Sequence, residues 1–348
     1  MKNVMRSRWT VVGSAIGTGL LIACTALATP VSPSSLTIAP GLGSTQWFIF
    51  NDAGTDGGPF GGTCDDSAAF GIDDADSASG NDDAFDIAWT VWIDGTAFVA
   101  PATVDLTGTT LLAGPVTMSG LNVWVQYFFS TTHQAARILV IMQNTGSAPI
   151  NATVQVPINF GSDSDTQVEA TSSGDTTVST ADRWVVTSDG GIGDPVNTTV
   201  FYGPGSPALT PSSYTQTVFD CSSTDGLGAT FGAQIPAASA RALMFFAGLG
   251  DISGTGNSVT NAVTNAALFD SVSNLSATDL LTGVTAGTSE SVLVLNWEGL
   301  SLPLPQQRLR VSPAPALHDT SLFLLAVVLT GLGAWNLWRA RRLSRPRA

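Results

Sequence analysis

Apolar residues alternate with polar ones along most of the chain. Val154, Val156 and Ile158 alternate with residues 153, 155 and 157, a pattern typical of a β-strand with one face in water. The stretches 121–129 and 136–142 are instead apolar on both faces. We therefore expect them to lie in the middle of a sheet that is covered on both sides.

Short strands separated by turn residues continue this pattern. Asp94-Gly95 lies between the apolar stretches 91–93 and 96–99, and this dipeptide favours a tight hairpin turn. Further strand candidates are 45–51, 182–188, 197–202, 238–247 and 290–297. The pattern predicts a mainly β protein in which residues 29–298 form a large β-sandwich ectodomain. Two packed sandwiches with a boundary near residue 130 are the alternative.

One segment departs from the strand pattern. Between Val259 and Thr282, alanine, leucine and asparagine replace the β-branched residues. Ser276 and Asp279 have the spacing of a capping box in front of Leu280. We expect one or two short helices here, lying over the sheet.

The N-terminal residues 1–28 have the pattern of a secretory signal peptide. Lys2, Arg6 and Arg8 precede an apolar stretch, and Ala26-Leu27-Ala28 forms an A-x-A cleavage site after Ala28. An alternative is lipidation of Cys24, because residues 21–24 (Leu-Ile-Ala-Cys) resemble a bacterial lipobox.

The C-terminal part predicts a membrane anchor. Residues 321–338 carry no charge and, at about 1.5 Å per residue in a helix, would just span the hydrocarbon core of a bilayer. Five arginines follow in the basic tail 339–348, which places that tail in the cytoplasm by the positive-inside rule. The proline-rich residues 299–320 predict a stalk between ectodomain and transmembrane helix. The ectodomain is then exported, periplasmic or at the cell surface.

The charge of the ectodomain limits its partners. Residues 29–318 hold five basic and 26 acidic residues, a net charge of −21. A surface of that sign repels nucleic acid and attracts cations. Nucleic acid is therefore excluded as a partner.

Aspartates concentrate between Asn51 and Asp86, where ten of them accompany seven glycines. Calcium binds six to eight hard oxygens on a flexible loop, which makes Ca²⁺ the candidate cofactor. The candidate ligands are Asp65, Asp66, Asp73, Asp74, Asp76, Asp82, Asp83 and Asp86. The alternative is a long solvated acidic loop without a metal.

Two cysteines remain after the signal peptide, Cys64 and Cys221. An exported chain is in a compartment that permits disulfides. These residues are a candidate disulfide, and two separate thiols are the alternative.

Candidate chemistry is sparse. His133 and His318 are the only histidines, so neither a zinc centre nor a serine triad in a Gly-x-Ser-x-Gly elbow is supported. A glycosidase needs only two carboxylates, and tryptophans could stack on sugars. The alternative is that the ectodomain tryptophans are core anchors of the sandwich: Trp47, Trp89, Trp92, Trp124, Trp184 and Trp297.

The C-terminal segment resembles the sorting segments of bacterial surface proteins, which combine a short motif, one helix and a basic end. Pro315-Ala316-Leu317 stands where the IPTL type has Pro-Thr-Leu, and residues 318–320 lack the tryptophan of that pattern. The resemblance implies a sorting protease as a partner. Residues 82–86, 144–146, 181–184 and 296–297 resemble a β-sandwich module of bacterial secreted proteins of unknown activity.

These features together predict a non-catalytic, exported, membrane-anchored surface or envelope protein with an adhesive or structural role. A glycan or another surface protein is the expected partner, besides the membrane. The alternative is a carbohydrate-binding or carbohydrate-cleaving domain that uses tryptophan and acidic residues.

Overall fold

The computed structural model describes residues 28–53, 58–61, 69–190, 193–205, 209–216 and 225–306. A compact unit extends to Leu304, and Pro305–Ala348 form a second unit of which only residues 305 and 306 are described. The predicted signal peptide up to residue 27, Cys24, Cys64, Cys221, the candidate ligands Asp65 and Asp66, and the predicted transmembrane helix 321–338 lie outside the described residues. Among the described residues, no helix is long and apolar enough to cross a membrane.

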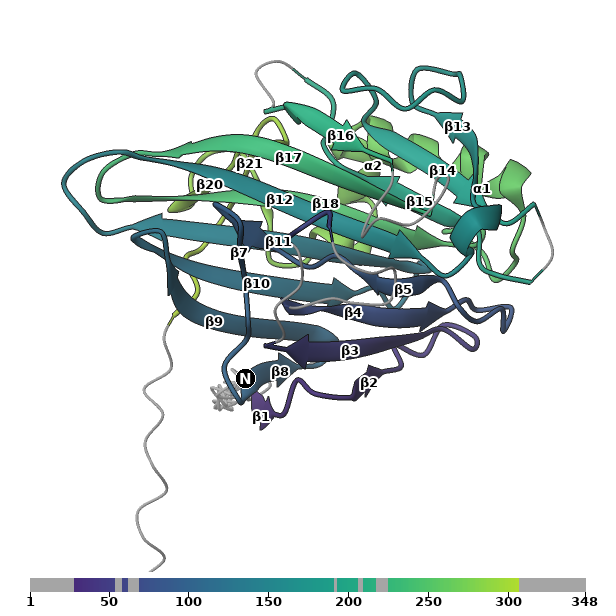
Figure 1. The fold of residues 1–348 in the computed structure, drawn as a ribbon, viewed down its shortest axis with the longest axis horizontal. Helices are drawn as coiled ribbons and strands as arrows, with labels where there is room; N and C mark the ends of the chain where they lie inside the picture. The colour runs from purple at the N-terminus through teal and green to yellow at the C-terminus, as the bar shows by residue number, and fades with distance from the viewer. Residues whose placement is uncertain are drawn as a thin grey trace, which may run out of the picture. The chain divides into compact units, whose positions relative to one another are not determined.

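The first of two β-sheets, sheet A, is built around the strands that the sequence predicts to be apolar on both faces (Figure 1). Its central strands β10 (Leu121–Phe129), β11 (Ala135–Asn144) and β18 (Ser239–Leu249) are antiparallel, with Ile138 opposite Phe245. On one side follow β9 (Thr110–Met118), β8 (Val104–Thr107) and β1 (Thr29–Val31), and on the other side β15 (Asn197–Val200), β14 (Trp184–Ser188) and β13 (Gln167–Thr171).

The second sheet, sheet B, lies against one face of sheet A. Its order is β16 (Ser213–Thr215), β17 (Gly226–Ile235), β12 (Ile150–Phe160), β5 (Phe85–Ala88), β4 (Ala69–Asp76), β3 (Gln46–Asp52) and β2 (Leu36–Ile38). The hairpin of β6 (Trp92–Ile93) and β7 (Thr96–Ala97) pairs with β12. Asp94 and Gly95 have φ values of 50° and 75°, as the tight hairpin turn predicted from their sequence requires.

The core between the sheets consists of residues at every second position of the strands. Ile138, Val140 and Met142 of β11 face this core, together with Val154, Val156 and Ile158 of β12. The β-sandwich class predicted from the alternation is therefore confirmed. Residue 130 lies between two paired strands of the same sheet, β10 and β11.

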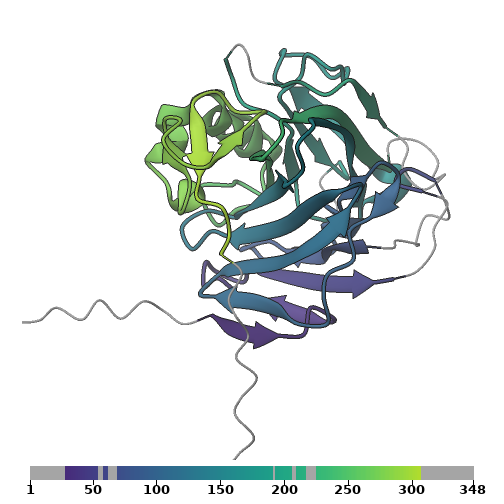
Figure 2. The same ribbon diagram turned by 90° about the vertical axis from the view of Figure 1, so that its left-hand side faces the viewer.

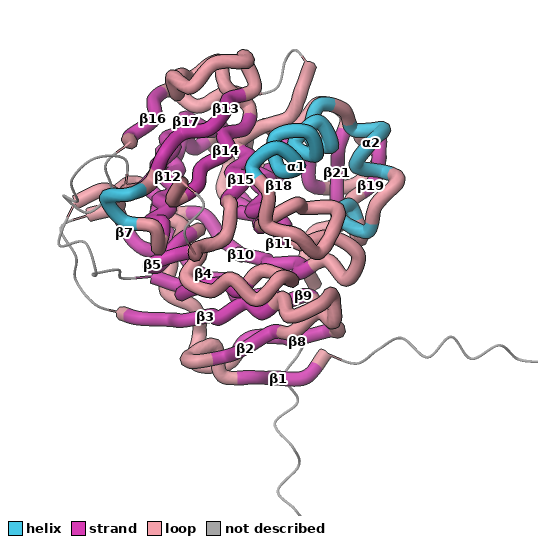
Figure 3. The backbone as a smooth tube through the Cα atoms, turned by 90° about the vertical axis from the view of Figure 1, so that its right-hand side faces the viewer, coloured by secondary structure: helices cyan, strands magenta, loops and turns pink. Residues whose placement is uncertain are grey.

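The other face of sheet A is covered as well. Leu139 and Ile141 of β11 point away from sheet B and pack in a second core with Phe269, Leu275 and Leu280. These three residues belong to the helical segment 259–281, which Figures 2 and 3 show at the side of sheet A. Burial on both faces explains why strands β10 and β11 lack the usual alternation.

The helical segment consists of short helices, as the sequence predicts: α1 (Val259–Asn265), η2 (Ala266–Asp270), α2 (Val272–Ser276) and η3 (Asp279–Leu281). Ser258 and Ser271 cap α1 and α2. The predicted capping box at Ser276 is wrong, because Ser276 lies in the last turn of α2 and its hydroxyl donates to the carbonyl of Val272. Thr278 caps η3 instead.

Asn296 closes a gap in sheet A. β15 pairs with the C-terminal half of β18, and β20 (Val292–Val294) pairs in parallel with its N-terminal half. Between them, the Asn296 side chain accepts a hydrogen bond from the Met244 N–H at 2.8 Å and donates to the Met244 and Phe201 carbonyls at 2.8 Å each. The buried amide thus takes the place of a strand peptide at Met244.

The predicted stalk begins too early. Leu300–Leu302 form β21, which pairs with β20 and with β19 (Thr285–Ala286) and is buried. The folded unit therefore continues past residue 298, because Leu300 and Leu302 complete the second core. The hydrophobic pattern also did not predict strands β9 and β17, because they contain glycine or proline, which are uncommon in strands.

Candidate functional site

The acidic segment is partly a pair of strands rather than a long solvated loop. Residues 69–72 are buried in β4, and this apolar start brings the aspartates that follow into sheet B. Asp73, Asp74 and Asp76 lie on β4, and Asp86 lies on β5 beside it (Figure 1). The backbone pairing of Ile72 with Ala88 holds the two strands together.

These strands form a pocket that is open to solvent. Its volume is about 210 Å³, and it is lined by Asp73, Asp74, Asp83, Phe85, Asp86 and Ile87. Phe85 is only 2% exposed, so it forms the floor and offers no free ring face. Asp74 is held in place because its Oδ1 accepts hydrogen bonds from the N–H groups of Ala75 and Phe85 at 2.6 and 3.2 Å.

Burial and mutual repulsion both act on the carboxyl groups of Asp73 and Asp83 in this pocket. Burial and the neighbouring charge of Asp74 raise the pKa of Asp73. Burial, Asp74, Asp163 and Asp82 raise the pKa of Asp83. Removing a carboxylate from water and placing it beside others both disfavour its charged form. Such a pocket would attract cations or cationic groups.

The structure brings together only some of the candidate calcium ligands. Asp73, Asp74, Asp83 and Asp86 line one pocket, whereas Asp76 and Asp82 are not among its lining residues. Burial and the charges of Asp74 and Asp82 raise the pKa of Asp76. In the described part of the chain, no three acidic, histidine or cysteine residues converge in a way that could hold a metal ion. Calcium stays a prediction, and thermal unfolding with and without EDTA would test it, since an unchanged midpoint would contradict it.

The sequence does not show that carboxylates from other parts of the chain join this cluster. Asp163 begins the short helix η1 (Asp163–Asp165), and Asp189 and Asp194 follow β14. Burial and the charges of Asp189, Asp83, Asp82 and Asp163 raise the pKa of Asp194 to about 6. More than 100 residues separate Asp83 from Asp194 in the sequence, so only the pairing of the strands brings them together.

The tryptophans of the described ectodomain do not offer stacking faces for sugars. Each is at most 7% exposed, as the exposed fractions show: Trp47 0%, Trp89 0%, Trp92 4%, Trp124 4%, Trp184 7% and Trp297 0%. Their interpretation as core anchors is therefore confirmed, and their use as a sugar-binding platform is wrong.

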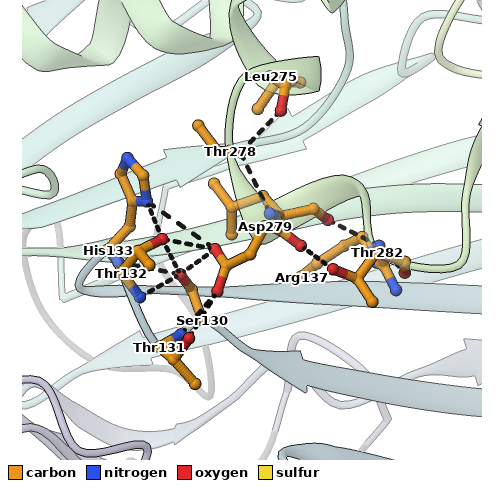
Figure 4. Close-up of polar contacts among 10 residues, drawn as sticks. Ser130, Thr131, Thr132, His133, Arg137, Leu275, Thr278, Asp279 and Thr282 are labelled. Atoms are coloured by element: carbon orange, nitrogen blue, oxygen red, sulfur yellow. Dashed lines mark hydrogen bonds and ion pairs between the residues drawn. The ribbon is translucent and has the colours of Figure 1, made fainter.

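A second polar cluster joins the helical segment to the turn between β10 and β11 (Figure 4). Asp279, at the start of η3, accepts hydrogen bonds from the hydroxyls of Ser130, Thr131 and Thr132 and from the Thr131 N–H. Burial raises the pKa of Asp279, but these hydrogen bonds outweigh it and hold the pKa below its ordinary value.

Arg137 lies next to this cluster and is 1% exposed. Its guanidinium donates to the carbonyls of Leu280 and Thr282 at 2.7 and 2.9 Å and to the side chain of Gln126 at 3.0 Å. Burial lowers the pKa of Arg137 to about 9, and the charge of Asp279 partly offsets this.

The cluster does not have the geometry of a serine triad. Ser130 donates its hydroxyl proton to Asp279 rather than to a histidine. His133 contacts the Thr132 hydroxyl through Nδ1 at 2.9 Å, and the same nitrogen is 3.9 Å from Asp279. A triad needs the histidine between the nucleophile and the carboxylate. The arrangement instead anchors the helical segment on sheet A.

Comparisons with known proteins add little to this picture. No model of a known protein family matches the chain, and no curated protein matches it. Among solved structures, the chain is similar to one described as a polysaccharide lyase, with a TM-score of 0.34 and 8% sequence identity. The match covers 62% of this chain and 33% of that chain. A likeness at this level carries no argument about activity.

Proposed function

We propose that the protein is a non-catalytic β-sandwich that is exported, anchored by its C-terminal segment, and used at the cell surface or in the envelope for adhesion or structure. The observation that carries the proposal is the position of the folded unit in the sequence, between the predicted signal peptide and the predicted C-terminal anchor. Strand β1 begins at Thr29, directly after the predicted cleavage site at Ala28, and the compact unit ends at Leu304.

The position of β1 gives the cleavage prediction a physical consequence. Thr29, Pro30 and Val31 pair with Leu106, Asp105 and Val104 at the edge of sheet A. A signal peptide that stayed attached would leave this edge strand tethered to the membrane. Cleavage after Ala28 would release a chain whose first residue already belongs to the sandwich.

Mass spectrometry of the cell-associated full-length chain tests export and processing together. We expect a mature N-terminus at Thr29 and protection of the basic C-terminal tail from protease added to intact cells. Cys24→Ser should leave the mature mass unchanged if cleavage follows Ala28. Loss of an acyl chain in that variant would favour lipidation of Cys24. A protein that is found in the cytosol and still begins at Met1 would overturn the proposal.

One observation favours the carbohydrate alternative, namely the open pocket with four aspartates, Asp73, Asp74, Asp83 and Asp86. Two suitably spaced carboxylates are the minimum for a glycosidase. A glycan array probed with the full-length protein in detergent would decide between the two. Cleavage of a glycan that Asp73→Asn abolishes and Asp105→Asn preserves would overturn the non-catalytic proposal, and we expect none.

A further inference from the structure

The sequence contains a single Asp-Pro pair, Asp194-Pro195. It lies in the connection between β14 and β15, which are neighbours in sheet A. An aspartate before proline has unusual chemistry, because its side-chain carboxyl can close a five-membered ring onto its own main-chain carbonyl. The proline nitrogen is then the leaving group, and as a tertiary amide nitrogen it is a better one than an ordinary peptide nitrogen.

The backbone on both sides of this bond is held by Asn257. Its side-chain amide donates to the Asp194 carbonyl oxygen at 2.9 Å and accepts from the Val196 N–H at 2.7 Å. The Val196 N–H can only donate, so the amide oxygen must face Val196 and the NH₂ group must face the Asp194 carbonyl. A donor aimed at a carbonyl oxygen stabilises the negative charge that develops there during nucleophilic attack.

Further contacts fix the same turn. The Gly250 N–H donates to the Val196 carbonyl at 2.7 Å, and the Asp194 N–H donates to Asp189 Oδ2 at 3.2 Å. Asn81 of the β4–β5 connection holds the preceding residue through the Gly193 carbonyl. The backbone around the bond is therefore held in one conformation, so that ring closure has to order only the Asp194 side chain.

The charges around Asp194 favour the protonated carboxyl that the reaction needs. The groups that act on it are Asp189 after β14, Asp82 and Asp83 before β5, and Asp163 in η1, all of them acidic. Together with burial they raise the pKa of Asp194 to about 6. The carboxyl is thus largely protonated in mildly acidic solution, where an ordinary aspartate is charged.

We propose that the Asp194–Pro195 bond is a self-cleavage site that the fold activates in mildly acidic conditions. An oxygen of the Asp194 carboxyl attacks the Asp194 main-chain carbonyl carbon and forms a cyclic anhydride. The C–N bond to Pro195 breaks, and the Pro195 nitrogen takes up the carboxyl proton and leaves as a secondary amine. One water then hydrolyses the anhydride to two carboxyl groups, so the net reaction is hydrolysis of one peptide bond.

The nicked protein would stay assembled. β14 and β15 remain paired from Trp184↔Val200 to Thr187↔Asn197, and β15 also pairs with β18. Cleavage would therefore change the freedom of the connection between β14 and β15 without releasing either half of the sandwich. The modification would show only when the chain is denatured.

The test is incubation of the purified full-length chain in detergent between about pH 5 and pH 8. We expect two fragments, one ending at Asp194 and one beginning at Pro195, in a first-order reaction that is independent of protein concentration. Its rate should rise as the pH falls through about 6. Fragments are separated at neutral pH without heating, because acid and heat cleave such bonds in any unfolded chain.

Matched variants separate activation by the fold from simple acid lability. Asp194→Asn should abolish cleavage. Pro195→Ala should abolish it as well, and it serves as a second test if Asp194→Asn folds poorly. Asn257→Ala should slow cleavage roughly 100-fold, the usual effect of removing one donor from an oxyanion site. Asn261→Ala, which changes a nearby asparagine that contacts Asp251 instead, should leave the rate unchanged.

The same chain in denaturing urea at the same pH supplies the decisive comparison. Cleavage that is no faster in the folded protein than in urea, or that is unaffected by Asn257→Ala in a folded variant, would overturn the proposal. Export and anchoring are read from the mature mass, so failure here and failure of the proposed function are distinguishable.

Discussion

Single polar residues in the interior of this protein act as substitutes for backbone. Asn296 is fully buried and makes three hydrogen bonds to main-chain atoms of Met244 and Phe201. The adjacent Trp297 also donates to the Met244 carbonyl, at 2.9 Å. An unpaired buried N–H or C=O costs free energy comparable to a lost hydrogen bond. Asn296 removes that cost where two strands share one side of β18.

We expect Asn296→Ala to lower the free energy of unfolding by roughly 2–3 kcal/mol, because it removes the hydrogen-bond partner of the buried Met244 N–H and of the Phe201 carbonyl. Urea unfolding followed by tryptophan fluorescence measures this change. Asn151→Ala is the matched control, since Asn151 lies exposed on β12 and its loss should cost less than about 0.5 kcal/mol. Equal losses in the two variants would contradict the substitute role of Asn296.

At the scale of elements, the helical segment is attached to sheet A by packing and by two charged side chains. Phe269, Leu275 and Leu280 fill the second core. Asp279 holds the turn 130–132 from one side, and Arg137 holds the carbonyls of Leu280 and Thr282 from the other. The helices are only three to seven residues long, and helices of this length need tertiary packing to form.

Asp279→Ala should therefore release the helical segment before the sandwich unfolds. We expect amide hydrogen exchange of residues 258–284 to become roughly 10-fold faster, which corresponds to about 1.4 kcal/mol, while β10 and β11 stay protected. Ser273→Ala, in the exposed face of α2, is the control and should leave exchange unchanged. Uniform acceleration over all strands would show that the anchor is not local.

For the whole molecule, the excess of aspartate makes stability depend on pH in an unusual direction. Asp73, Asp76, Asp83, Asp194 and Asp225 all have pKa values raised above those of free aspartate, mainly by burial and then by neighbouring aspartates. A raised pKa means that the folded state binds protons more readily than the unfolded state. Stability then falls as the pH rises through these pKa values.

We predict that the midpoint of urea unfolding rises when the pH falls from about 7.5 to about 5. The opposite trend should begin below about pH 4, where Asp182 and Asp279, whose pKa values are lowered in the fold, become protonated. Unfolding curves recorded soon after each pH change measure the slope. Asp194→Asn should flatten the slope of the midpoint against pH above about pH 5. The control is Asp105→Asn on β8, which removes the same charge elsewhere in the sandwich. A midpoint that falls steadily from neutral pH would contradict this account.

The features that can be predicted from the sequence are those that depend on neighbouring residues. The turn at Asp94-Gly95 and the doubly apolar strands β10 and β11 were predictable, because a tight turn and the period of side chains along a strand are local properties. The cap of η3 was misplaced from Thr278 to Ser276. Both residues can cap a helix, and the packing of Leu275 decides where α2 ends.

The pattern of residues along the chain was therefore sufficient for the β-sandwich class, for the helical interruption at residues 259–281, and for core positions of the tryptophans. All of these follow from periodicity and composition over a few neighbouring residues. The tertiary structure alone decided which carboxylates meet. It places Asp83, Asp163 and Asp194 in one electrostatic cluster and Asn257 against the Asp194–Pro195 bond. Contacts between residues so far apart in sequence depend on strand pairing in space, and no local pattern encodes that pairing.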